Sequence, residues 1–143
     1  MKHLRLIGMG CLVATLVACG GGSGSSSLNV QNYEGTVLEG SSASVVVEVA
    51  VASNGTISGK STLLSSFSGA IIGRATLTGS IDSSGAFSIS GYYTLYLPPP
   101  PGGSAEGLMT VTGTIPAGGS SSVPIDVKNG TTTYHGTINP ITP

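Results

Sequence analysis

Few side chains in this 143-residue chain can act as nucleophiles, bases or metal ligands. There are two cysteines (Cys11 and Cys19), two histidines (His3 and His135) and six acidic residues. A Ser-His-Asp system needs a histidine close to both a carboxylate and an activated serine. Serine is abundant, but no Gly-x-Ser-x-Gly motif lies on a strand-to-helix turn. We therefore expect His135 to be a surface residue and the protein not to be an enzyme.

The acidic residues do not form a metal or cofactor motif. They are scattered without the spacing of a calcium loop, and His135 has no second histidine near it. Asp82 lies in an Asp-Ser-Ser-Gly segment, where an aspartate usually caps a turn with its own side chain. Glu34, Glu39 and Glu48 could supply a carboxylate pair for glycoside hydrolysis, but the sequence provides no geometry for them. We predict no catalytic residue, no metal site and no cofactor.

The thiol of Cys19 has a different chemical use, as the attachment point of a lipid. Lys2 and Arg5 give the chain a positive start, and residues 6–17 form an almost wholly apolar run. This run is too short to span a membrane and has the length of a signal-peptide core. It ends in Leu16-Val17-Ala18-Cys19, whose leucine occupies a position that ordinary secretory cleavage reserves for a small residue.

This tetrapeptide resembles the lipobox of bacterial lipoproteins, which consists of leucine, a tolerated residue, a small residue and cysteine. The resemblance covers about the first 20 residues and implies that Cys19 becomes the mature N-terminus and carries acyl chains. Several acyl chains together hold a protein durably at a membrane. Gly20 replaces the aspartate that retains many lipoproteins in the inner membrane of enteric bacteria, which favours the outer membrane of the cell envelope. An uncleaved or differently cleaved secretory segment is the alternative.

Changes in composition divide the chain into three parts. We predict a lipoprotein signal peptide over residues 1–18, a lipidated cysteine with a Gly/Ser tether over 19–28, and a single all-β domain over 29–143. The domain is long enough to bury a core and holds no cysteine for a disulfide. It has three basic and six acidic residues and therefore no basic patch. We expect a membrane, reached through the lipid anchor, as a partner, and no nucleic acid.

Beyond the tether, apolar and polar residues alternate with a period of two, and turn residues interrupt the alternation at short intervals. Asn-Gly pairs at 54–55 and 129–130 are strong hairpin signals, because these residues tolerate a positive φ. The pattern predicts about eight strands joined by successive hairpins, over residues 35–39, 44–52, 56–64, 70–81, 86–97, 106–115, 123–127 and 131–138.

Glycines recur on the predicted apolar face of these strands, at Gly59, Gly73, Gly79, Gly91, Gly113 and Gly136. A glycine within a strand permits strong bending or close approach of a neighbouring backbone. We therefore predict a small antiparallel up-and-down barrel of about eight strands, with a β-sandwich as the alternative. The outer faces carry Ser, Thr, Glu and Arg and few aromatic residues, so we do not expect the barrel to span a membrane.

Two tyrosines form the candidate binding patch. Tyr92 and Tyr96 share the predicted outward side of one strand and precede the proline loop Pro98–Pro101. Exposed aromatic rings beside a rigid polyproline segment can form a contact surface for a protein or a glycan. In the alternative, the loop folds back and covers the rings. The outward faces also carry rows of threonines, which ice-binding surfaces use but which any solvated strand favours.

These features favour a non-catalytic, lipid-anchored envelope module with a binding or structural role. The second hypothesis is a carrier, because inward glycines would leave space for a small apolar ligand inside the barrel. An enzyme is the third. A carrier requires a continuous apolar interior cavity, and a Ser-His-Asp enzyme requires a carboxylate within hydrogen-bond reach of His135.

Overall fold

The computed structural model describes residues 31–39, 43–65, 67–98, 101, 104–119 and 121–141. The signal segment, Cys19 and the Gly/Ser tether lie outside these residues. The described residues contain no helix that has the length and apolar character needed to cross a membrane. They form eight strands: β1 (Gln31–Glu39), β2 (Ala43–Val51), β3 (Thr56–Ser65), β4 (Ile71–Ile81), β5 (Ala86–Leu95), β6 (Glu106–Thr114), β7 (Val123–Asn129) and β8 (Thr132–Pro140).

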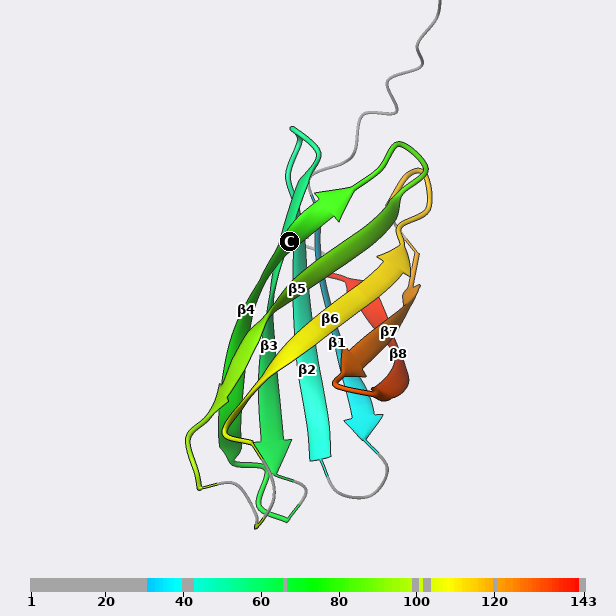
Figure 1. The fold of residues 1–143 in the computed structure, drawn as a ribbon. Coiled ribbons are helices and arrows are strands. Elements are labelled where there is room, and N and C mark those ends of the chain that lie inside the picture. The colour runs from blue at the N-terminus through cyan, green and yellow to red at the C-terminus, as the bar shows by residue number, and fades with distance from the viewer. Residues whose placement is uncertain are drawn as a thin grey trace, which may run out of the picture.

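The eight strands form a closed barrel (Figure 1). Each strand pairs antiparallel with the next one along the chain, and β8 pairs antiparallel with β1 to close the sheet. The predicted all-β, antiparallel up-and-down barrel is therefore confirmed, and the alternative of a sandwich is excluded. Closure also removes the free edges through which β-sheets of separate molecules pair.

The register of the strands determines the width of the barrel. A line of directly opposite residues starts at Gln31 on β1, crosses each strand in turn and reaches Tyr134 on β8. Because Val37 pairs with Gly136, Tyr134 lies opposite Glu39 of β1. The line therefore returns to β1 eight residues after Gln31, where it began. Eight strands with a stagger of eight residues enclose an interior that side chains can just fill.

Side chains from all eight strands occupy this interior. Valine and isoleucine predominate, because β-branched residues favour the extended backbone and pack well on a pleated surface. Among the described residues, Ser61 is the only buried polar side chain, and its hydroxyl has no hydrogen-bond partner. The buried apolar residues are Tyr33, Val37, Val45, Val47, Val49, Val51, Ile57, Leu63, Ala75, Leu77, Phe87, Ile89, Tyr93, Met109, Val111, Ile115, Val123, Ile125, Val127 and Ile138.

Glycines allow neighbouring strands of the barrel to approach closely. A Cβ atom on Gly79 would lie 1.9 Å from the carbonyl oxygen of Ser88, and one on Gly91 would lie 1.9 Å from that of Thr76. Both contacts join β4 to β5, where the pairing is interrupted around Gly91. Any larger residue at either position would push these strands apart, so the glycines permit the coiling that closes the sheet.

β1 and β5 differ from the ranges that the alternation predicts. β1 begins at Gln31, four residues before the predicted start, and this extension buries Tyr33 in the core. β5 ends at Leu95, so Leu97 is exposed although the alternation places it on the buried face. The reason lies in Pro98, since a proline cannot donate the hydrogen bond that would continue the ladder.

The predicted turns form between the strands. Gly55 and Gly130 adopt positive φ angles of 79° and 59°, whereas the asparagines before them do not adopt a positive φ. Asp82 is confirmed as a turn residue, because its Oδ1 accepts hydrogen bonds from the backbone N–H groups of Ser84 and Ala86 at 2.8 and 3.1 Å. The hydroxyl of Ser84 also donates to it, and these bonds hold the pKa of Asp82 below its usual value by stabilising the carboxylate.

Candidate functional site

Tyr92 and Tyr96 project from the outer face of the barrel. Their side chains are 72% and 57% exposed, in contrast to the buried ring of Tyr93 between them. Tyr96 follows directly after β5, and its backbone N–H donates to the carbonyl oxygen of Ile72 on β4 at 2.8 Å. The predicted outward orientation of both rings is therefore confirmed.

One apolar side chain and two charged side chains lie next to the two rings on the neighbouring strands. Leu108 on β6 lies directly opposite Tyr92 and is itself exposed. Between the rings, Thr94 lies opposite Arg74 of β4 on one side and opposite Glu106 of β6 on the other. All three of these side chains are exposed. The candidate site, which we call the β5 face, thus consists of two aromatic rings separated by a row with one positive and one negative charge.

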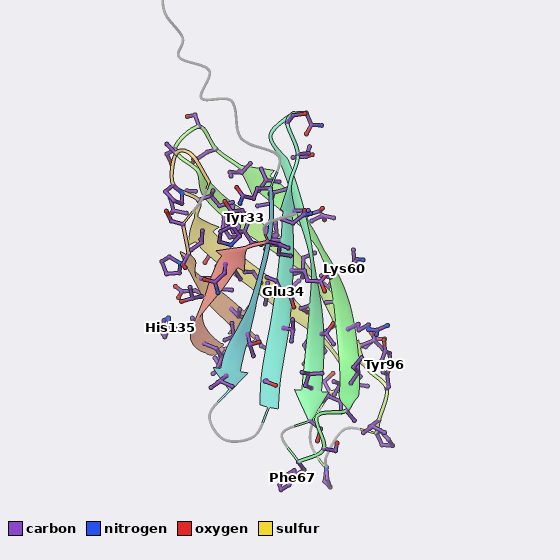
Figure 2. The ribbon with its side chains drawn as sticks, turned by 180° about the vertical axis from the view of Figure 1, so that it is seen from behind. Tyr33, Glu34, Lys60, Phe67, Tyr96 and His135 are labelled. Carbon is purple, nitrogen blue, oxygen red and sulfur yellow. The ribbon has the colours of Figure 1, made fainter. Side chains whose placement is uncertain are left out.

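Further apolar side chains are exposed where β5 ends. Phe67, in the turn between β3 and β4, is fully exposed, and Ile71 at the start of β4 and Leu97 just after β5 are exposed as well. Figure 2 shows Phe67 at the tip of this end of the barrel and Tyr96 near the same end. Sequence reasoning missed these residues. The signal that could have identified Phe67 is its position as a large apolar residue within a Ser- and Gly-rich turn.

His135 is exposed as predicted, and the structure adds a partner that the sequence did not reveal. Its Nδ1 lies 2.6 Å from Oδ1 of Asp126, because the two residues are directly opposite each other on β7 and β8. In the part of the chain that the structure describes, this is the only ion pair and no hydrogen bond joins His135 to a hydroxyl. The carboxylate that a Ser-His-Asp system needs is therefore present, but no serine among the described residues is hydrogen-bonded to His135.

The Asp126–His135 pair therefore acts as a cross-strand contact. Its side chains are 53% and 79% exposed, and ion pairs with this exposure contribute little to stability. Figure 2 shows His135 and Tyr96 on different sides of the barrel, so the pair lies away from the β5 face. The pairing follows from the register of the β7–β8 hairpin, in which Asn129 lies opposite Thr132. A two-residue turn made of Asn129 and Gly130 would instead place Asp126 opposite Thr133, so the sequence signal alone would have predicted another partner.

Two of the three glutamates that could form a carboxylate pair are brought together. Glu34 and Glu48 lie directly opposite each other on β1 and β2, whereas Glu39 is at the other end of β1. Lys60 of β3 lies opposite Glu48, on the side of β2 away from Glu34, and its charge offsets the repulsion between the two carboxylates. Both glutamates are exposed, so they lack the apolar surroundings that keep a general acid protonated in a glycosidase.

Two of the hollows lined by described residues are on the outside of the barrel. One, of about 460 Å³, lies beside Asp126 and is bordered by Thr112 and Pro124. The other, of about 320 Å³, lies over the first four strands and is bordered by Glu48 and Lys60. Neither is the interior cavity that a carrier requires. Within the described ranges, no group of three or more His, Cys, Asp or Glu residues could hold a metal ion.

Comparisons of the chain with protein-family models, curated proteins and solved structures find no match.

Proposed function

We propose that this chain is a non-catalytic binding module of the bacterial cell envelope, held at the outer membrane by lipid on Cys19. The partner binds the β5 face. The observation that carries the proposal is the exposure of Tyr92 and Tyr96 on a barrel that places its other large apolar strand residues mostly inside. An aromatic ring buries a large area when a partner covers it, and tyrosine is enriched among the residues that dominate binding energy.

The rigidity of the barrel supports a binding role. Thr94 is paired on both sides, Tyr92 is paired with β6, and Tyr96 is held to β4 by its backbone hydrogen bond. Because the backbone that carries the rings is held in place before the partner arrives, binding loses little backbone conformational entropy. The closed barrel therefore presents a prepared surface.

The position of the β5 face also suits a tethered protein. β1, the strand that follows the predicted tether, starts at the end of the barrel near Tyr33. In Figure 2, Tyr33 lies toward one end of the barrel, and Phe67 and Tyr96 lie toward the other. A lipid anchor that precedes β1 would leave the Tyr96 end directed away from the point of attachment, where a partner can reach it.

The test is capture of envelope components by the full-length protein with both tyrosines replaced by alanine. The Tyr92→Ala, Tyr96→Ala double variant should lose the components that the wild type retains, while its melting temperature stays the same because both rings are exposed. Leu38→Ala is the matched control, since Leu38 is 69% exposed on β1, away from β5. Unchanged capture by the double variant would overturn the proposal.

A further inference from the structure

The spacing of the two rings suits an extended ligand. Tyr92 and Tyr96 are four residues apart along an extended segment, so about 13 Å separates their Cα atoms. Their even separation puts both rings on the same side of the sheet. A pyranose ring has a C–H face that stacks on an aromatic ring and a rim of hydroxyls that needs polar partners. Two rings at this separation can hold two non-adjacent sugars of one linear chain.

Hydroxyl groups line the outward side of β5. Every outward position from residue 88 to residue 96 carries one, and threonines of β4 and β6 lie opposite Ser88 and Ser90. A hydroxyl both donates and accepts hydrogen bonds, as a polyol ligand requires. The core of a protein–protein interface is instead depleted in serine and charged residues. The hydroxyl-bearing outward residues are Ser88, Ser90, Tyr92, Thr94 and Tyr96.

The charges of the β5 face indicate that the ligand is uncharged. Arg74 and Glu106 flank Thr94 with opposite signs, so they add no net charge between the rings. Neither residue has an ion-pair partner among the described residues, and both groups are free to bond sugar hydroxyls. A polyanionic chain would need an excess of positive charge, which this face does not have.

From these three features we infer that the β5 face binds a neutral linear polysaccharide that lies along β5, with sugar rings stacked on Tyr92 and Tyr96. Arg74, Thr94 and Glu106 bind the sugar hydroxyls between the rings. The inference rests on the proposed function and names the class of partner. It is specific to this face, because the described parts of the other strands expose no second pair of aromatic rings.

The test is a titration of the full-length protein, in detergent, with cellohexaose, chitohexaose, laminarihexaose and maltohexaose. An oligogalacturonate of similar length serves as the anionic probe. Binding can be followed by calorimetry and by tyrosine fluorescence, which is readable because the chain contains no tryptophan. We expect at least one neutral hexasaccharide to bind, with little dependence on salt because no charge is neutralised.

Variants assign this binding to the rings. Tyr92→Ala and Tyr96→Ala should each weaken it about tenfold, whereas Tyr92→Phe, which keeps the stacking surface, should weaken it much less. Leu38→Ala should leave it unchanged. The inference is overturned if no neutral hexasaccharide binds, if the oligogalacturonate binds more tightly, or if the alanine variants bind as well as the wild type.

Failure of this inference can be separated from failure of the proposed function. If capture of envelope components still depends on both tyrosines but none of the saccharides binds, the partner is not a neutral glycan and the binding module stands. A captured protein whose retention also falls with Leu108→Ala would identify a protein partner instead. If neither capture nor saccharide binding depends on the tyrosines, both proposals are wrong.

Discussion

Tyr33 shows how one side chain can join distant parts of this barrel. It is almost completely buried, and its hydroxyl donates a hydrogen bond to the carbonyl oxygen of Gly119 at 2.8 Å. This bond connects β1 to the turn between β6 and β7, 86 residues further along the chain. Gly119 has a positive φ of 63°, which a glycine adopts without strain. Burial raises the pKa of Tyr33, because the ionised phenolate loses hydration in the core.

We expect Tyr33 to make the barrel less stable at alkaline pH. Below about pH 10 its contribution is complete, because the residue is neutral in both the folded and the unfolded protein. As the pH rises from there through the raised folded pKa, the unfolded chain ionises first and the contribution is lost. Tyr33→Phe should remove this part of the pH dependence and cost about 1 kcal/mol at neutral pH, through the lost hydrogen bond.

The measurement is urea unfolding of wild type and Tyr33→Phe at several pH values between neutral and strongly alkaline. Tyr92→Phe is the control, since Tyr92 is exposed and lies outside the core that holds Tyr33. Parallel pH profiles for wild type and Tyr33→Phe would show that the burial of Tyr33 has no effect on its ionisation.

At the scale of the strands, β4 and β5 show why glycines occupy inward positions of a small barrel. The alternation along each strand predicts which residues face inward, and the glycines at those positions permit coiling. The structure supplies the contact itself, since the Cα of Gly91 lies against the backbone of Thr76 with no room for a methyl group. The same strand carries the outward tyrosines, so the packing inside the barrel also positions the β5 face.

Gly91→Ala should destabilise the barrel by about 1–3 kcal/mol, because the added methyl group would overlap the carbonyl oxygen of Thr76 and push β4 from β5. Ser90→Ala is the control at the adjacent outward position and should change the stability by less than about 0.5 kcal/mol. Denaturant unfolding of both variants measures the difference. A neutral Gly91→Ala would mean that the strands can separate at this point without loss.

For the whole molecule, closure of the barrel explains how a domain without a disulfide can be stable. Eight strands share one packed interior, and the sheet has no edge that could pair with another molecule. The outward Ser and Thr side chains keep the exterior polar. In the proposed arrangement, attachment to a membrane is the task of the lipid on Cys19.

The lipid anchor itself is tested at this scale. Cys19→Ser should move the protein from the membrane fraction to the soluble fraction, because serine cannot form the thioether that carries the acyl chains. Cys11→Ser should leave the protein in the membrane fraction, since Cys11 lies within the predicted signal peptide. Fractionation followed by detergent extraction measures the partition. A Cys19→Ser protein that stays with the membrane would contradict the predicted topology.

The sequence by itself determined the features that depend on near neighbours. Alternation predicts the strands, Asn-Gly pairs predict the hairpins, and the inward glycines favour a closed barrel, because each signal involves residues close together in the chain. The outward orientation of Tyr92 and Tyr96 belongs to this group. The early start of β1 was missed, since it is the core contact of Tyr33 with a distant turn that makes the extension favourable.

Only the tertiary structure decided which outward residues meet across strands. The row of Arg74, Thr94 and Glu106 depends on two registers at once, and the pairing of β8 with β1 depends on all of them. Each hairpin contributes its own shift, and a change of a single residue in any of them would move every later strand. The β5 face therefore follows from the registers of β5 with its two neighbours, and the closure of the barrel follows from the summed stagger of all the strands; no local pattern in the chain contains either.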